Sequence, residues 1–474
     1  MQNTEEIWRL VDARKDAFEQ MSDRIWGMPE IAYTETQSCA EHTAMLKREG
    51  FRVTSNVADI PTAVMGEAGD GGPVIAILGE YDALPGLSQE AGVAEHRPLP
   101  GNGHGHGCGH NLLGSASLLA AAAVKDYLAA HGIKGRVRYY GCPAEEGGAA
   151  KGFMVRAGSF DDVDVAVSWH PAAFAGVNEA KSLANTRIDF TFNGRASHAA
   201  AAPHLGRSAL DAVELMNVGV NYMREHMPSD ARVHYALLDA GGIAPNVVQA
   251  RAKVRYLVRA RNLPELNRLI ARVIRIAEGA ALMTETKMEH RVVSAVSNLL
   301  PNTPLERAMH DNLMRLGPPP FDEADRAFAT KIQATLSDED IESAFRRVGL
   351  PMQKGVTLCE QIVPLDAKSA PMMGSTDVGD VSWKVPTVQA RGATYAIGTP
   401  GHSWQLTAQG KMPAAHKGMV HVAKVMAGTA IDVIRDETLL ARAKADHQTR
   451  LTDTPYVCPL PPDVQPPIEM SKAA

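Results

Sequence analysis

The sequence predicts an α/β protein: a mixed, mostly parallel sheet covered by helices, into which a smaller α+β unit is inserted. Two observations carry this prediction. Short apolar runs alternate with helical stretches in the first and last parts of the chain, as in strands that are connected by helices. In the middle of the chain, apolar and polar residues alternate within strand-like runs, in the order β-α-β-β-α-β. We therefore expect one large domain, formed by residues 1–185 and 298–474, and an inserted domain at residues 186–297.

Composition excludes several classes of protein. The chain has 474 residues, of which 45% are hydrophobic and 22% charged, as is usual for a globular protein. A net charge of −6 argues against nucleic-acid binding, and five widely spaced cysteines argue against a secreted disulfide framework. No signal peptide is visible, and the longest apolar stretch, residues 112–124, is too short to span a bilayer. We therefore expect a cytoplasmic protein that binds neither nucleic acid nor membrane.

The elements of the large domain follow from periodicity. Apolar residues at helical spacing over 7–25 predict one amphipathic opening helix. The apolar run over 112–128 predicts a buried helix. Further apolar runs predict buried strands at 74–78, 137–140, 163–167 and 388–397.

The elements of the inserted domain follow in the same way. The patterns predict helices over 207–225 and 266–274, and strands at 188–192, 233–238, 247–258 and 289–296. Alternation in these strands predicts a ferredoxin-like unit with one polar sheet face. Outside it, the Pro- and charge-rich residues 317–340 predict a long loop or a surface excursion, and the prolines of 453–474 predict a tail that packs as an extended arm or frays.

The densest cluster of chemically active side chains lies between a predicted strand and the buried helix. It reads GHGHGCGHN at residues 103–111. Glycines allow the backbone to fold tightly there, so that Cys108 and His110 can point at one position. Thiolate and imidazole suit a borderline-soft cation such as zinc. The alternative is a flexible loop that binds nothing.

Three further segments strengthen the metal hypothesis, because each follows a predicted strand. Glu145 and Glu146 are adjacent, so that one could ligate a metal while the other acts as a base; the alternative is a solvated pair in a turn. His170 and His402 follow two other strands, although a single histidine at such a place is more often structural. Asp82 could orient a metal-bound histidine, or simply cap a turn before Pro85. We expect these strand ends to bring one set of side chains to one sheet edge: Cys108, His110, Glu146, His170 and His402.

Together these segments resemble the aminoacylase and carboxypeptidase-G type amidohydrolases, which are dinuclear metallopeptidases. The resemblance covers nearly the whole chain. It rests on GEYDALPG at 79–86, HGCGHN at 106–111, PAEEGG at 143–148, WHP at 169–171, SHA at 197–199, GSTDVGD at 374–380 and HSWQ at 402–405. It implies a zinc-exopeptidase-like catalytic domain and an inserted domain that forms a dimer and acts as a lid.

The resemblance also implies roles for individual residues. The five side chains of the sheet edge would bind two divalent metal ions, zinc or manganese and possibly cobalt, and Glu145 would be the general base. His198 would reach into the neighbouring subunit's site and stabilise the oxyanion; the alternative is a histidine in a turn. The chain departs from the family at two positions: Glu80 stands where most members have His or Asp, and Asn111 stands where many have Asp.

The expected function is that of a metal-dependent amidohydrolase acting on an N-acyl amino acid, with p-aminobenzoyl-glutamate as the first substrate to test. Asn246 lies where relatives often contact substrate, and Arg255 could clamp a carboxylate or be a solvated charge on the sheet face. A dipeptidase or an aromatic-amine hydrolase would use the same site on another bond. A non-catalytic partner subunit is a third possibility, which the intact ligand and base set disfavours. We expect a homodimer through the inserted domain, or a hetero-oligomer with a homologous subunit.

Overall fold

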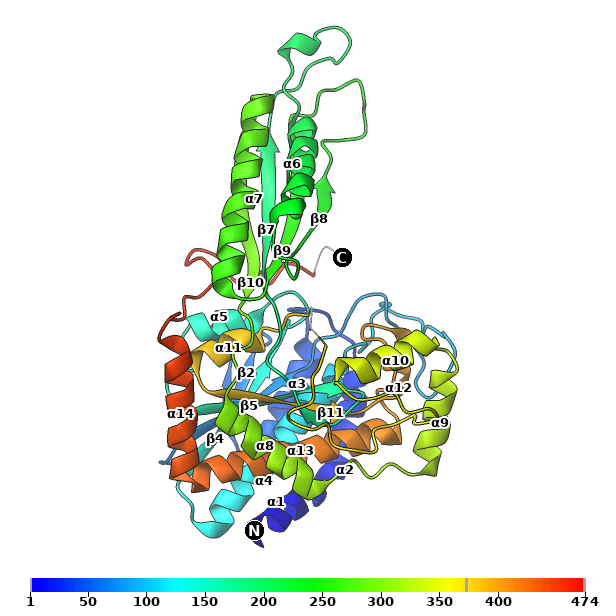
Figure 1. Ribbon diagram of the computed structural model, residues 1–474, viewed down its shortest axis with the longest axis vertical. Helices are drawn as coiled ribbons and strands as arrows, with labels where there is room; N and C mark the ends of the chain where they lie inside the picture. The colour runs from blue at the N-terminus through cyan, green and yellow to red at the C-terminus, as the bar shows by residue number, and fades with distance from the viewer. Residues whose placement is uncertain (1, 371–373, 472–474) are drawn as a thin grey trace.

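The computed structural model describes residues 2–370 and 374–471, and it contains two separate sheets (Figure 1). The larger sheet has seven strands in the order β1-β2-β4-β3-β5-β11-β6. Its central strands β4, β3, β5 and β11 are parallel, whereas β1, β2 and β6 are antiparallel to their neighbours. The strands are β1 (Arg52–Ser55), β2 (Val64–Asp70), β3 (Val74–Glu80), β4 (Gly135–Cys142), β5 (Val165–Ala172), β6 (Gly176–Val177) and β11 (Thr387–Ala393). The predicted mixed α/β class is confirmed.

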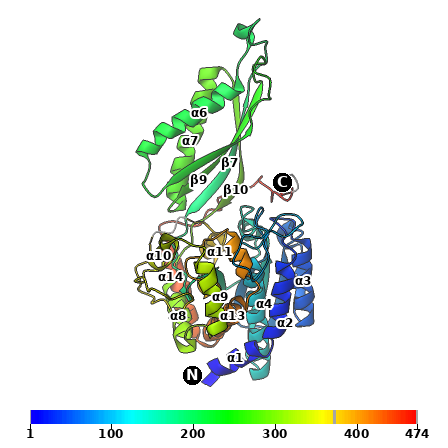
Figure 2. The ribbon, with the colours of Figure 1, turned by 90° about the vertical axis from the view of Figure 1, so that its right-hand side faces the viewer.

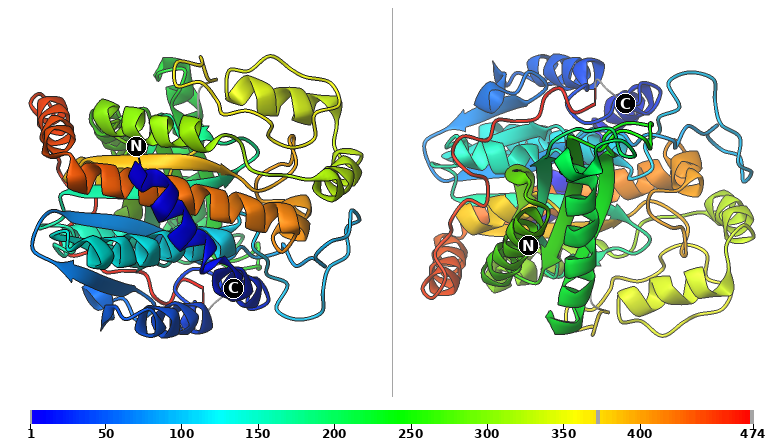
Figure 3. Two further views of the ribbon diagram at one scale, coloured as in Figure 1. Left: turned by 90° about the horizontal axis from the view of Figure 1, so that it is seen from below. Right: turned by 90° about the horizontal axis from the view of Figure 1, so that it is seen from above.

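Helices cover both faces of this sheet (Figure 3). On one face α4 (His110–His131) packs against α13 (Pro413–Arg435) and β3. On the other face α5 (Ala150–Arg156) packs against α11 (Val378–Lys384). Among the described residues one helix, α4, is long and apolar enough to cross a bilayer, but 83% of its most apolar window is buried in the structure, which is typical of a core helix.

The large domain contains eight further α-helices among the described residues. They are α1 (Gln2–Asp12), α2 (Lys15–Trp26), α3 (Thr36–Arg48), α8 (Thr303–Leu316), α9 (Glu323–Gln333), α10 (Asp338–Arg347), α12 (Trp404–Gln409) and α14 (Glu437–Leu451). Over the described part of the C-terminal tail, residues 453–471, there is no helix or strand, which agrees with the predicted extended arm. The tail is held to α5, because Arg156 donates hydrogen bonds to the carbonyls of Pro461 and Val464 at 2.7 and 2.6 Å.

The second sheet and two helices form a unit that projects from the large domain (Figures 1 and 2). Its strand order is β10-β7-β9-β8, with every neighbouring pair antiparallel, which is the predicted ferredoxin-like arrangement. The strands are β7 (Ala184–Asn193), β8 (Arg232–Asp239), β9 (Arg251–Ala260) and β10 (Lys287–Val296), and the helices are α6 (Ala209–Met223) and α7 (Leu263–Thr284). Both helices cover one sheet face (Figure 2). The other face is polar, as expected, because the less buried side chains of β9 include Arg251, Lys253 and Arg255. The domain boundaries at 185/186 and 297/298 stay a prediction.

Several predicted elements have different bounds, including β5, which runs to Ala172 rather than Val167, and α7, which runs to Thr284 rather than Ile274. The opening helix is two helices, α1 and α2, separated at Ala13 and Arg14. The late strand ends at Ala393 rather than at Ile397, and β9 begins at Arg251 rather than at Val247.

The loop predicted at 317–340 is wrong, because this segment contains α9 and the start of α10. Two capping boxes explain these helices: Asp322 with Asp325, and Ser337 with Asp340, exchange side-chain and backbone hydrogen bonds. The prolines and charged residues of this segment favoured a loop in the sequence and hid the capping boxes.

Candidate metal centre

Tight turns place Cys108 and His110 at the start of α4. Gly109, which precedes the helix, has φ +77°, and a side chain in that conformation would be strained. A Cβ on Gly105 would lie 1.9 Å from the carbonyl oxygen of Leu87. The glycines of the 103–111 segment therefore permit the fold that aims Cys108 and His110 inward.

The other predicted ligands come from three segments of the large sheet. Glu145 and Glu146 follow β4, as expected. His170 lies within β5 rather than beyond its end, and His402 lies in the loop that follows β11. His402 has φ +55°, which is rare for a residue with a side chain and costs free energy that the surrounding structure must supply.

The five predicted ligands gather in two overlapping groups. Cys108 Sγ lies 3.4 Å from His170 Nε2, and His402 Nε2 lies 3.0 Å from Glu146 Oε1. In each group the candidate ligand atoms are all within 4.8 Å of one another: Cys108, His110 and His170 in one, and Cys108, Glu146 and His402 in the other. Cys108 belongs to both groups, so its sulfur is the ligand-type atom that the two groups share.

Asp82 contacts one residue of each group. Its Oδ1 lies 3.0 Å from His110 Nδ1, and its Oδ2 accepts a hydrogen bond of 2.9 Å from the backbone N–H of Glu146. The first contact leaves His110 Nε2 facing the cluster. That nitrogen is buried, has no hydrogen-bond partner among the described residues, and lies 3.3 Å from Glu80 Oε2. A buried nitrogen of this kind, near a thiol, another imidazole and two carboxylates, fits a divalent metal.

A buried ion-pair network, which the sequence analysis did not foresee, adjoins this cluster. Lys151 Nζ lies 2.7 Å from Glu80 Oε1 and 2.6 Å from Asp377 Oδ1, and all three side chains are buried. Glu80 forms a third ligand-type group with His110 and Glu145. Asp377 belongs to the 374–380 segment that carried part of the resemblance, but no sequence pattern singled out Lys151, in the short helix α5.

Burial and like charges perturb the acid–base groups of the site. Burial, together with the carboxylates of Glu80 and Glu146, raises the pKa of Glu145 well above its usual range. Burial also raises the pKa of the Cys108 thiol and lowers the pKa of His170. Perturbed groups that converge in one cavity are typical of catalytic sites.

The ligand cluster lies in a cavity of 440 Å³ between the two sheets. Its floor includes Cys108, Glu145, Glu146, His170 and His402. Its roof is the end of the polar face of the smaller sheet: Asn185, Arg187, Leu257, Arg259, Ser294 and Val296. Arg187 and Arg259, which no sequence pattern singled out, bring two guanidinium groups over the cluster.

The structure does not bring Arg255 to this cavity. Its guanidinium is paired with Asp189, at 2.6 Å for Nε to Oδ1 and 3.0 Å for Nη2 to Oδ2, and it lines another cavity beside the C-terminal tail. His198 and Asn246 are also absent from the cavity lining. They are neighbours in the loops that follow β7 and β8, where the carbonyl of Asn246 accepts a 2.9 Å hydrogen bond from the backbone of Ala199. These loops lie at the end of the projecting unit farthest from the large sheet (Figure 1).

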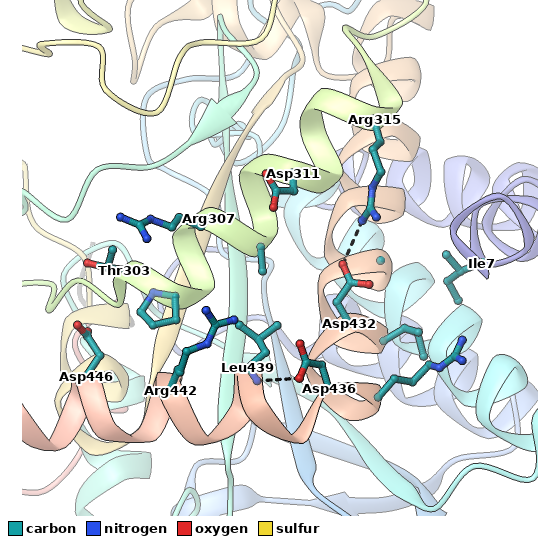
Figure 4. Close-up of a pocket in the computed structure, with 15 residues that line it drawn as sticks. Ile7, Thr303, Arg307, Asp311, Arg315, Asp432, Asp436, Leu439, Arg442 and Asp446 are labelled. Atoms are coloured by element: carbon teal, nitrogen blue, oxygen red, sulfur yellow. Dashed lines mark hydrogen bonds and ion pairs between the residues drawn. The ribbon is translucent and has the colours of Figure 1, made fainter. Parts of the chain in front are cut away.

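A larger groove of 730 Å³ lies between α8, α13 and α14 (Figure 4). Arginines and aspartates line it, and pairs such as Arg315 with Asp432, at 3.1 Å, balance their charges. None of the candidate metal ligands lines it. The candidate active site is therefore the smaller cavity between the sheets.

Comparison with known proteins agrees with this geometry. Residues 76–404 match the model of Peptidase family M20/M25/M40. The chain is 47% identical to a p-aminobenzoyl-glutamate hydrolase subunit of Escherichia coli (strain K12), over 98% of this chain and 99% of that protein. It is 28% identical to the Xaa-Arg dipeptidase of Mus musculus, over 94% of this chain and 91% of that protein.

Among solved structures, the Bacillus subtilis YXEP protein, described as a dinuclear metal binding peptidase from the M20 family, has a similar fold. The TM-score is 0.58 at 18% identity, over 89% of this chain and 99% of that chain. The predicted resemblance to the metallopeptidase-type amidohydrolases is confirmed. The chain is an enzyme that belongs to peptidase family M20/M25/M40.

Proposed function

We propose that this enzyme hydrolyses p-aminobenzoyl-glutamate to p-aminobenzoate and glutamate. The observation that carries the proposal is the convergence of Cys108, Glu146, His170, His402 and the perturbed carboxyl of Glu145 in one cavity, with His110 buried beside them. The relative that is 47% identical over nearly the whole chain is named as part of a hydrolase of this substrate, which supports the choice of substrate.

The site would hold two divalent ions through Cys108, His110, Glu146, His170 and His402. Bound ions of this kind polarise an amide carbonyl and lower the pKa of water to about 7. Thiolate and imidazole favour zinc, while manganese and cobalt are also compatible with this mixed set of ligands. Asp82 would hold His110 in the orientation that keeps Nε2 toward the cluster.

Glu145 would act as the general base. Its carboxylate would take the proton of the attacking water and pass it to the glutamate nitrogen as the amide bond breaks. A pKa raised by burial and by Glu80 suits this role, because it favours the proton on Glu145 after its removal from the water.

Arg259 would bind the α-carboxylate of the glutamate half. It lines the cavity, and its Nη1 donates a hydrogen bond of 3.2 Å to Ser375 Oγ, which orients the guanidinium. Guanidinium groups bind carboxylates through two parallel hydrogen bonds. Arg259 thereby takes the role that the sequence analysis gave to Arg255.

A second copy of the chain would complete the site. His198 and Asn246 lie too far along the projecting unit to line their own cavity, but in a dimer they would cover the partner's cavity. His198 Nδ1 accepts hydrogen bonds from the backbone of Ala200 and Ala201, at 3.2 and 3.1 Å. Its Nε2 would therefore carry the proton and stabilise the oxyanion.

The surface that would form the dimer is the edge of the smaller sheet. β8 is an edge strand, and exposed apolar side chains gather on it and on α6. They are Leu215, Val218, Tyr222, Tyr235, Leu237 and Leu238. A homodimer is the simplest assembly; the word subunit in the name of the similar E. coli protein makes a hetero-oligomer the alternative. We expect the protein to act in the cytoplasm.

The test is metal reconstitution. Chelated protein is supplied separately with zinc, manganese or cobalt, and release of p-aminobenzoate is followed for the wild type and for Glu145→Gln. We expect metal-dependent release that is lost in the variant while metal binding remains. Two metal ions per chain without release of p-aminobenzoate would overturn the substrate, and absence of metal binding would overturn the site.

A further inference from the structure

Two guanidinium groups face the metal cluster from adjacent strands of the smaller sheet. Asn185 is opposite Arg259, and Arg187 is opposite Leu257, in the register of β7 with β9. Because side chains alternate between the faces of a strand, Arg187 and Arg259 lie on the same face. That face ends over the cavity, so that both arginines line it together with Glu145 and His170.

Arg187 is in an unusual electrostatic position. Its Nη1 donates a 3.1 Å hydrogen bond to the carbonyl of Gly147, and among the described residues it has no ion pair. Arg255, on the same sheet face, is by contrast paired with Asp189. Burial, and then the charges of Arg255 and Arg259, lower the pKa of Arg187. Asp189 offsets this only in part, and a partly buried cation without a direct ion pair is costly, so that an anion in this part of the cavity would be stabilised.

We propose that Arg187 binds the side-chain carboxylate of the amino acid released by the reaction, and thereby restricts the substrates to N-acyl amino-dicarboxylates such as N-acyl glutamates. This inference rests on the proposed function, in which Arg259 takes the α-carboxylate. Gly147 is two residues beyond Glu145, so that its hydrogen bond keeps the guanidinium close to the group that protonates the leaving amine. A substrate ending in arginine would place its own cation against Arg187, and the charge repulsion would exclude it.

The test compares p-aminobenzoyl-glutamate with p-aminobenzoyl-glutamine, which has nearly the same shape and no side-chain charge. For the wild type we expect kcat/KM to be about 10- to 100-fold higher for the glutamate compound, as for one hydrogen-bonded charge pair. In Arg187→Gln the preference should fall close to unity, mainly through loss of activity on the glutamate compound. Arg187→Lys, which keeps the charge, should retain part of the preference for the glutamate compound.

Arg255→Gln is the matched control. It removes a cation from the same sheet face but outside the cavity, and Lys253 still pairs with Asp189 at 2.6 Å. The ratio of kcat/KM for the glutamate compound to kcat/KM for the glutamine compound should equal that of the wild type. Equal kcat/KM for the two compounds in the wild type, or an unchanged preference in Arg187→Gln, would overturn the inference while leaving the proposed function intact.

A binding measurement separates the two proposals. Calorimetry on the metal-loaded protein compares glutamate with glutamine without requiring turnover. We expect glutamate to bind more tightly, and this difference to disappear in Arg187→Gln. That result would support the inference even if the wild type does not hydrolyse p-aminobenzoyl-glutamate; equal binding in the wild type and the variant would overturn it whatever the activity.

Discussion

Lys151 and Asp377 form a fully buried ion pair, with 2.6 Å between Nζ and Oδ1, that joins α5 to the segment before α11. The backbone N–H of Lys151 also donates to Asp377 Oδ2 at 3.0 Å. Because Lys151 contacts Glu80 as well, one ammonium group holds two carboxylates beside the candidate metal ligands. The 374–380 segment is thus tied to the site through Lys151 and through the hydrogen bond from Arg259 to Ser375.

Replacement of this lysine should destabilise the protein severely. In Lys151→Met two carboxylates are left buried without their cation, and we expect a loss of about 3–5 kcal/mol in the free energy of unfolding. Denaturant unfolding of the metal-loaded protein measures it. Lys134→Met is the control, because Lys134 pairs with Asp70 at the surface and its loss should leave the unfolding free energy unchanged within error. Equal stability of the two variants would contradict the structural role of Lys151.

Metal stoichiometry tests the shared position of Cys108. Because Cys108 belongs to both ligand groups, Cys108→Ala should weaken both metal sites. His402 belongs to one group, so that His402→Ala should lose one ion and retain the other. Metal content after dialysis gives the answer. Loss of equal amounts of metal in the two variants would contradict a bridging thiolate.

Much of the fold could be predicted, because strands and helices buried on both sides leave long apolar runs. The strand that begins at Val74 and the core helix α4 are examples. Surface elements were harder, because their signals are local and polar. The capping boxes at Asp322 and Ser337 begin two helices that composition alone suggested to be a loop.

The candidate ligands could be predicted because each lies in a short motif, whereas the arginines of the cavity could not. Arg255 and Arg259 lie on one face of β9, and alternation does not tell which of them is near the metal cluster. Four residues along a strand correspond to roughly 13 Å, which is enough to move a guanidinium out of the cavity. Lys151 gave no signal, because a lysine in a short helix is usually solvated.

Glu35 makes stability depend on pH. Burial, and then the charge of Asp82, raise the pKa of Glu35 from 4.5 to about 8, while its Oε1 accepts hydrogen bonds from the backbone of Tyr33 and Ala144. The folded protein thus retains a proton that the unfolded chain releases above 4.5, so that this group lowers stability as pH rises toward about 8. The slope is at most about 1.4 kcal/mol per pH unit.

Glu35→Gln keeps an acceptor for both backbone groups and removes the titration. Unfolding free energies measured between about pH 5 and about pH 8 should therefore decline less in the variant than in the wild type. Parallel pH profiles for the two proteins would show that Glu35 does not titrate in this range.

Complementation between inactive chains tests whether His198 acts across a dimer. In a mixed dimer of His198→Ala and Glu145→Gln, the first chain retains a complete metal cluster with Glu145, and the second chain supplies an intact His198. One of the two sites is then complete, and we expect about half of the wild-type activity, although each variant alone is inactive. The mixed dimer is purified through two different tags, and release of p-aminobenzoate is measured.

A mixed dimer of Cys108→Ala and Glu145→Gln is the control: both changes lie in the same cavity of their own chain, so that neither site is repaired. Activity in His198→Ala alone, or an inactive mixed dimer, would assign His198 to the turn between β7 and α6 instead.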